Sequence, residues 1–441
     1  MMEIMKLLSK ILKISYLLPI FLCIIFWALL AILRDNYSLF GIDSTYFFHA
    51  GKSIFTIPLD MYKPGFYYLP VFAFLISPIT LLPFEIYEWV LLIVLLFFSG
   101  YSIVLLNRIL IFKNINNKFI RFLFLLVVFN GHAWFEQFDL LNVKTIVLFL
   151  FILFIERELK ARKSILTINY KFLSLQLCIL SIILSILPYF IFIVPIYLVH
   201  DTNIRDIFKK VQIKKYLLFA LIFVGLNFVF IIYPYLFVDF LNGLSFPRSF
   251  PVDIYSLTPE FIINNDMATP TNLLIGLISI LKIDISASLI TVVLSSLFTL
   301  LLVIRYKDML IERKLAFFCL FSLLFNSYLR TNTHVATLPI IMLLFSDQEK
   351  ITLLKSYNIF LFIKKNIILV LGMMIISILL FLPDLEFIYR MFKILRYIPV
   401  QLMIFTWPLL YCCLWMMVHL FNKKELDRKE IINYTDKISN L

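Results

Sequence analysis

Long apolar runs recur along nearly the whole chain and are separated by shorter polar segments. An α-helix needs about 20 mostly apolar residues to cross the hydrocarbon core of a membrane. The runs therefore predict an all-α polytopic membrane protein with about twelve transmembrane helices, folded as one domain over residues 1–441. The predicted spans are residues 15–33, 88–106, 119–135, 140–155, 171–188, 189–200, 216–236, 285–304, 315–329, 334–346, 366–383 and 399–421.

The apolar run 66–84 differs from these spans because Pro70, Pro78 and Pro83 interrupt it. A proline inside a helix removes a backbone donor and kinks or breaks the helix. We predict that this segment enters the membrane from the outer side and returns to it, or lies on the surface. A full crossing is the alternative, and it would place the basic segment 107–121 outside.

The distribution of charged residues indicates which loops lie on which side of the membrane. Hydrophobic residues make up 62% of the chain and charged residues 15%, and the formal net charge is +13. The loops on one side carry 30 of the 40 Lys and Arg residues. Because positively charged loops stay cytoplasmic, both termini, including the tail 422–441, are expected in the cytoplasm. The net charge thus reflects topology, and no nucleic-acid partner is expected.

Two long polar segments, 34–87 and 237–284, fall on the extracytoplasmic side. Loops of this length are uncommon unless they are functional, so the active surface is expected there. The five cysteines all lie in apolar runs, and the chain contains neither a phosphate-cradling glycine loop nor an HExxH motif. Neither a metal nor a cofactor is therefore expected.

The first of these loops carries a spaced motif. Its residues are Asp43, Phe47, Phe48, Ala50, Gly51, Asp60, Tyr62, Phe66, Tyr68, Pro70, Pro78, Leu82 and Pro83. This spacing resembles the signature of glycosyltransferase family 87, the polyprenyl-phosphate-sugar-dependent mannosyltransferases of the GT-C superfamily. Weaker similarities to the family follow at Gly131 with Gln137–Asn142, and at Ser327, His334 and Pro339. The chain departs from the family pattern at Phe47-Phe48, Leu69 and Leu187, where two tyrosines, a proline and a lysine are common.

The resemblance implies a GT-C-like fold with a large first extracytoplasmic loop, a catalytic Asp43 and a polyprenyl-phosphate sugar donor. The chemistry of sugar transfer from such a donor needs the same groups: a base for the acceptor hydroxyl and a cationic site for the departing phosphate. Phosphate is already a good leaving group, so one carboxylate suffices and inversion at C1 is expected. The alternative role for Asp43 is to cap a helix over residues 44–52.

Further residues are predicted to bind substrate. They are Tyr46, His49, Tyr62, Tyr68, Gln137, Asp139, Asn142, Arg330 and His334. The last two form a compact cationic pair that is expected to bind the donor phosphate. The tyrosines could instead form an interfacial aromatic belt, the segment 137–142 could be a solvated hairpin, and His334 could be an interfacial anchor. Lys144, just inside an apolar run, either snorkels or binds phosphate.

The sequence therefore predicts a monomeric membrane hexosyltransferase, with mannose as the expected sugar. Its partners would be a polyprenyl-phosphate sugar donor, a lipid-linked or surface glycan acceptor, and membrane lipids. The main alternative is a lipid-linked oligosaccharide transporter or polymerase, but a transporter would place ionisable residues near the bilayer midplane. A membrane acyltransferase is the second alternative, for which His200-Asp201 is the one cytoplasmic pair.

Overall fold

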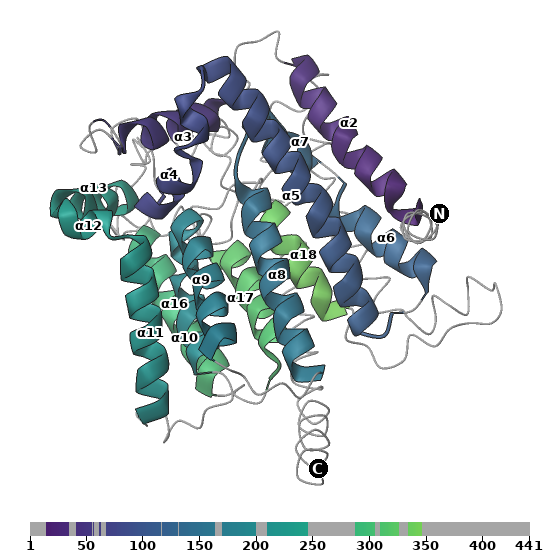
Figure 1. The fold of residues 1–441 in the computed structure, drawn as a ribbon. Helices are drawn as coiled ribbons and strands as arrows, with labels where there is room; N and C mark the ends of the chain where they lie inside the picture. Colours follow the sequence, from purple (N-terminus) through teal and green to yellow (C-terminus); the bar gives the residue numbers. More distant parts are fainter. Residues whose placement is uncertain are drawn as a thin grey trace, which may run out of the picture.

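The computed structural model describes most of the first 345 residues. Every regular element in this part of the chain is a helix (Figure 1). The predicted all-α class is thus confirmed for the described residues, whereas the predicted spans 366–383 and 399–421 lie outside them. The described residues are 15–34, 41–54, 56, 61–62, 68–115, 117–130, 132–163, 170–199, 210–245, 287–304, 309–325 and 334–345.

Several predicted spans correspond to single helices. Helix α5 is four residues longer at its start and six residues longer at its end than the predicted span 88–106. The helices in this group are α2 (Leu18–Arg34, preceded by the 3-10 turn η1, Ser15–Leu17), α5 (Phe84–Phe112), α8 (Lys144–Lys163), α9 (Tyr170–Ile186), α16 (Ala287–Ile304), α17 (Ile311–Phe325) and α18 (His334–Phe345).

Helix α5 is the longest of the described helices, with 29 residues. At a rise of 1.5 Å per residue it spans about 43 Å, which exceeds the roughly 30 Å of a bilayer's hydrocarbon core. Within the described ranges it is the one helix that is both long and apolar enough to cross a membrane. Shorter apolar stretches occur at Leu18–Leu33, Phe172–Ile186 and Val292–Ile304.

Three predicted spans are wrong as continuous helices. The run 119–135 divides into α6 (Lys118–Val128) and α7 (His132–Asp139), and the run 189–200 divides into η5 (Pro188–Phe192) and α10 (Ile193–Leu198). The run 216–236 divides into α11 (Lys210–Leu226), α12 (Val229–Ile232) and the start of α13 (Pro234–Ser245). In this last case Asn227 marks the break, because its amide donates to the Phe223 carbonyl and its Oδ1 accepts from the Val71 amide.

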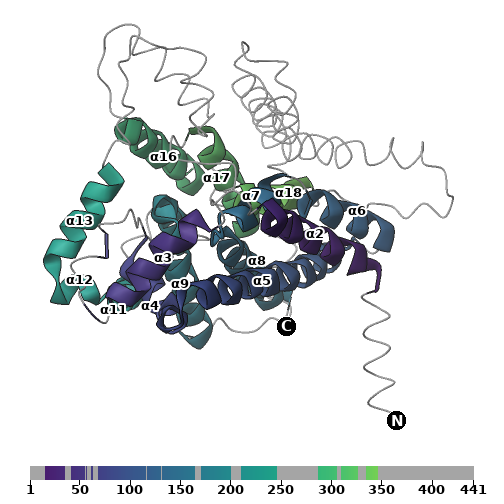
Figure 2. The same cartoon turned by 90° about the horizontal axis from the view of Figure 1, so that it is seen from above.

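The segment between α2 and α5 contains three short elements: α3 (Ile42–Ser53), α4 (Pro70–Ile76) and η4 (Ile79–Leu81). Helix α3 lies across the upper end of the bundle in Figure 1, and α4 packs against both α3 and α9 (Figures 1 and 2). Helix α4 has seven residues, too few to cross a bilayer alone. The amide of Leu69, just before α4, donates to the Ser185 carbonyl of α9 at 2.8 Å. This contact fixes α4 against the bundle.

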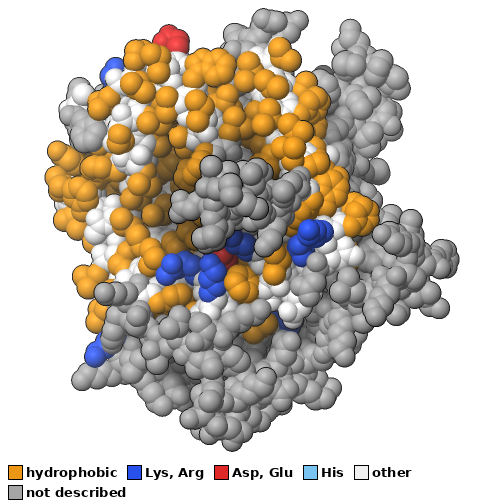
Figure 3. All heavy atoms as spheres, turned by 45° about the vertical axis from the view of Figure 1, so that its right-hand side comes forward, with side chains coloured by type: hydrophobic (Ala, Val, Ile, Leu, Met, Phe, Trp, Pro, Cys, Tyr) orange, Lys and Arg blue, Asp and Glu red, His pale blue; other side chains and the backbone are white. Residues whose placement is uncertain are grey.

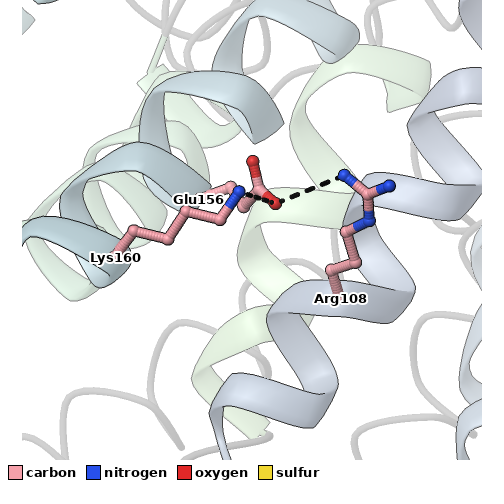
Figure 4. A network of polar contacts seen from close by, with 3 residues as sticks. All are labelled: Arg108, Glu156 and Lys160. Atoms are coloured by element: carbon pink, nitrogen blue, oxygen red, sulfur yellow. Dashed lines mark ion pairs between the residues drawn. The ribbon is translucent and has the colours of Figure 1, made fainter. Parts of the chain in front are cut away.

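The opposite end of the bundle carries a different set of polar contacts (Figure 4). The buried Glu156 carboxylate of α8 lies 2.7 Å from Lys160 Nζ and 3.7 Å from the Arg108 guanidinium of α5. Charge assigns residues 107–121 and 156–171 to the cytoplasmic side, and it assigns residues 34–87 to the outer side. In the fold these two groups of segments lie at opposite ends of the bundle (Figure 1).

The outer surface of the bundle is strongly apolar. In the view of Figure 3, hydrophobic side chains cover most of the described surface, while most of the visible Lys and Arg side chains gather along its lower border. Large hydrophobic side chains that point outward include Leu22, Leu33, Phe97, Leu217 and Leu221. Monomeric soluble proteins rarely expose contiguous apolar areas of this kind, so this surface suits contact with lipid or with another apolar surface.

Candidate functional site

Gly41 sets the start of helix α3. It is the N-cap residue and has a φ of 74°, in the left-handed region that favours glycine. A Cβ atom at this position would collide with the Glu88 carboxylate of α5. Glu88 in turn accepts a hydrogen bond from Ser44 Oγ at 3.0 Å, and the Tyr87 hydroxyl donates to the Ser44 carbonyl at 3.3 Å. The first turn of α3 is therefore fixed against the start of α5.

Asp43 lies in this first turn and does not cap the helix. The N-cap is Gly41, and no side chain makes a capping hydrogen bond there, so the capping alternative is wrong. The Asp43 carboxylate instead accepts a hydrogen bond from Asn142 Nδ2 at 2.5 Å. A carboxylate in the first turn is also favoured by the partial positive charge of the helix N-terminus. The hydrogen bond from Asn142 therefore holds the Asp43 side chain in place.

The turn between α7 and α8 supplies the partner of Asp43. Leu141 adopts a positive φ of 47°, and the Asn142 amide donates to the Gln137 carbonyl at 3.0 Å. The Gly41 amide donates to the Asp139 carbonyl at 2.9 Å. This turn is therefore anchored to the start of α3 through both backbone and side-chain hydrogen bonds.

Three buried polar side chains lie in or beside the same turn. The amide of Gln137 is fully buried, and neither its oxygen nor its nitrogen has a hydrogen-bond partner among the described residues. The same is true of Asn142 Oδ1 and Thr145 Oγ1. Buried polar groups are almost always hydrogen-bonded, so this cluster is a site where polar ligand groups would be favourable.

Lys144 begins α8 and adds a positive charge to the turn. It is 8% exposed, and its Nζ lies 5.5 Å from the centre of the Tyr68 ring, within the range of a cation–π interaction. The Tyr68 ring makes an edge contact with the Phe47 ring of α3, with centres 5.2 Å apart. Phe47 follows Asp43 by four residues and so shares its face of the helix. Tyr68 and Asn142 thus join Lys144 to the side of α3 that carries Asp43.

Tyr62 helps to hold Tyr68 in place. Its hydroxyl donates to the Tyr68 carbonyl at 3.2 Å, and its ring packs against Phe240 of α13. Burial raises the pKa of the Tyr62 phenol, and the negative charge of Asp239 raises it further. Tyr62 therefore stays protonated and remains a hydrogen-bond donor to the segment that carries Tyr68.

The remaining predicted residues are distributed differently. Tyr46 is partly buried and His49 is exposed, both on α3. Arg330 lies outside the described residues, and for His334, the first residue of α18, only the backbone is described. The structure thus brings Asp43, Asn142 and Tyr68 together with the backbone carbonyls of Gln137 and Asp139.

Glu88 and Thr145 are site residues that sequence reasoning missed. Glu88 is a single carboxylate near the start of an apolar helix, which is a signal for a functional or structural partner. Thr145 follows Lys144 within an apolar run, and its hydroxyl is small enough to be tolerated in any buried helix. No sequence pattern therefore distinguishes it from an ordinary core threonine.

Comparison of the chain with protein-family models, curated proteins and solved structures finds no match. No group of three His, Cys, Asp or Glu side chains that could hold a metal occurs in the described part of the chain. The candidate site is thus a fixed carboxylate beside a buried ammonium group, an aromatic ring and several buried polar atoms. Such a site can accept a proton and bind an anion.

Proposed function

We propose that this protein is an integral membrane glycosyltransferase of the GT-C type. It transfers a hexose, with mannose as the first candidate, from a polyprenyl phosphate to a lipid-linked or surface glycan. The supporting observation is the Asp43 carboxylate, which is held by Asn142 at 2.5 Å at the end of the bundle assigned to the outside. The resemblance of residues 43–83 to glycosyltransferase family 87 supports the same reaction.

The reaction assigns a role to each charged group. The acceptor hydroxyl oxygen attacks C1 of the donor sugar while the bond from C1 to the phosphate oxygen breaks. Asp43 takes the hydroxyl proton as general base, and the leaving polyprenyl phosphate keeps the bonding electrons. A nearby cation stabilises the developing phosphate charge. Because the nucleophile and leaving group occupy opposite sides of C1, the configuration inverts.

The apolar surface and the distribution of charge support the proposed location in a membrane. Helix α5 is long enough to cross a bilayer, and the outward-facing leucines of α2 and α11 suit a lipid environment. We propose about twelve crossings, with both termini cytoplasmic and the site outside. The protein would act as a monomer.

A transporter is the rival that the structure addresses most directly. Ionisable residues in transporters lie near the bilayer midplane. Helix α5 carries no charged residue between Glu88 and Arg108, and α8 carries none between Lys144 and Glu156. The charged residues of α5 lie near its two ends, and those of α8 are Lys144 and residues within 156–163. The uncharged middle of α5 and the uncharged residues 145–155 of α8 favour an enzyme at the membrane surface over a central transport pathway.

Transfer in reconstituted liposomes tests the proposal. Purified protein would receive a panel of polyprenyl-phosphate hexoses with labelled sugars, together with a membrane lipid extract as acceptor. We expect label to move to an acceptor with at least one polyprenyl-phosphate donor and with no sugar nucleotide. A folded protein that transfers from none of these donors would contradict the proposal, and a glycolipid that crosses the bilayer unchanged would support the transporter.

A further inference from the structure

We propose that Lys144, resting on the ring of Tyr68, binds the phosphate of the lipid-linked donor. This inference rests on the proposed function and deepens it. The sequence left Lys144 with two possible roles, snorkelling or phosphate binding, and the contacts of Lys144 in the structure favour phosphate binding. The predicted roles of Arg330 and His334 stay predictions.

The first argument is position. Lys144 follows Asn142 by two residues, and the Asn142 amide donates directly to the Asp43 carboxylate. One short turn therefore contacts the base with one side chain and supplies an ammonium group with another. A glycosyl donor needs this arrangement, because its C1 atom must lie near the base-bound acceptor while its phosphate contacts a cation.

The second argument is the fixed geometry of the ammonium group. Lys144 Nζ lies 5.5 Å from the centre of the Tyr68 ring, and Tyr68 is itself held by the Tyr62 hydroxyl on its carbonyl. The ring of Tyr68 also contacts Phe47, on the same helix face as Asp43. The aromatic ring thus borders both charged groups, and its fixed position limits the rotamers open to the lysine.

The third argument is the set of polar atoms beside the lysine. Lys144 is 8% exposed, and further buried polar atoms occur in the turn before it and in the residue after it. Gln137 Nε2 and Thr145 Oγ1 are buried donors with no partner among the described residues, and Asn142 Oδ1 is a buried acceptor with none. Donors of this kind suit phosphate oxygens, and the acceptor suits a sugar hydroxyl.

The fourth argument is the helix that Lys144 begins. Helix α8 has 20 residues, and the first turn of a helix presents backbone amides and a partial positive charge to an anion. Lys144 and Thr145 lie in that first turn. The phosphate would therefore meet a side-chain cation, a hydroxyl and a helix N-terminus at one place.

Binding of polyprenyl phosphate to the purified protein in nanodiscs tests the inference. Lys144→Met removes the charge, whereas Lys144→Arg keeps it. Lys52→Met is the matched control, because Lys52 is an exposed lysine on α3 whose Nζ lies 5.6 Å from the Phe48 ring. We expect Lys144→Met to weaken binding about 10- to 100-fold, the usual effect of losing a charged hydrogen bond. Lys144→Arg should stay within about threefold of wild type, and Lys52→Met should not change the affinity.

A second ligand separates the donor phosphate from an ordinary lipid headgroup. Phosphatidylglycerol offers a phosphate without the polyprenyl chain, and we expect it to compete poorly and to bind the Lys144→Met variant as it binds wild type. If Lys144→Met weakened the binding of polyprenyl phosphate and of phosphatidylglycerol equally, the site would be a general headgroup site and the inference would be overturned. Thermal unfolding shows whether the Lys144→Met variant is folded. If it is not folded, Lys144→Gln takes its place, because glutamine keeps a polar group at this buried position.

The possible failures are distinguishable. If wild type transfers sugar and Lys144→Met binds polyprenyl phosphate as tightly as wild type, the proposed function stands and the role of Lys144 is wrong. If wild type neither binds polyprenyl phosphate nor transfers sugar from it, both proposals are wrong.

Discussion

Asp43 depends on Gly41 for its position. The left-handed conformation of Gly41 starts α3, and its amide donates to the Asp139 carbonyl beside the turn that carries Asn142. The absence of a side chain at Gly41 leaves room for the Glu88 carboxylate, which accepts from Ser44. One glycine therefore connects α3, α5 and the α7–α8 turn, and Asp43 follows it by two residues.

Gly41→Ala should disturb this connection. An alanine there would be strained by about 1–2 kcal/mol in the left-handed region and would also collide with Glu88. Because a displacement of about 1 Å can cost 100-fold in rate, we expect transfer per folded molecule to fall by about that factor. Gly225→Ala is the control, since a Cβ there meets nothing within 4 Å. Equal transfer by both variants would show that Gly41 does not position the base.

The Asn142→Leu variant tests whether Asn142 positions Asp43 for catalysis or only stabilises the fold. Loss of its hydrogen bond to Asp43 should lower kcat about 10- to 100-fold and change the KM for the donor little. Asn107→Leu is matched to it, because Asn107 is also buried and accepts one hydrogen bond, from the Tyr16 hydroxyl at 2.6 Å, at the other end of the bundle. The control should lose stability and keep its kcat. A similar fall of kcat in both variants would indicate a purely structural effect.

At the scale of elements, hydrophobic runs located the helices well because apolar length is what a buried or lipid-facing helix requires. They failed where the backbone turns inside an apolar run. Asn227 ends α11 by bonding to the Phe223 carbonyl and the Val71 amide, and the second partner is 156 residues away. The pairing of Asp43 with Asn142 spans 99 residues, so spacing could nominate both residues but could not show that they meet.

The pairing of α5 with α8 leads to a prediction about stability. The Glu156 side chain is 3% exposed, while Arg108 and Lys160, which share it, are about half exposed. Glu156→Gln removes the charge that holds both cations, so we expect a loss of about 1–3 kcal/mol. Lys160→Gln should cost less than about 0.5 kcal/mol, as for other exposed i,i+4 pairs. Thermal unfolding in detergent measures both, and a larger loss for Lys160→Gln would contradict this interpretation.

At the scale of the whole molecule, we propose that the two polar ends of the bundle face the two sides of a membrane. The end with Asp43 and Lys144 is assigned to the outside, and the end with Arg108 and Glu156 to the cytoplasm (Figures 1 and 4). In the proposed orientation, the candidate base and the candidate phosphate site would lie at the surface where lipid-linked substrates meet water.

Cysteine labelling tests this orientation. In a variant without the native cysteines, Thr56→Cys beyond α3 and Lys118→Cys at the start of α6 place thiols at opposite ends, and both positions are exposed. An impermeant maleimide should label position 56 in intact cells and position 118 after permeabilisation alone. The reverse pattern would invert the topology and move the candidate site to the cytoplasmic side.

The transfer rate of Asp43→Asn is the most direct test of the central claim. The variant keeps the size of the side chain but cannot accept a proton at neutral pH, and loss of a positioned base costs about 10²–10⁴-fold in rate. Measured in liposomes against a donor that wild type uses, the folded variant should lose at least about 100-fold. A folded Asp43→Asn variant that keeps more than about a tenth of wild-type transfer would contradict the mechanism, because that loss is smaller than removal of a base produces.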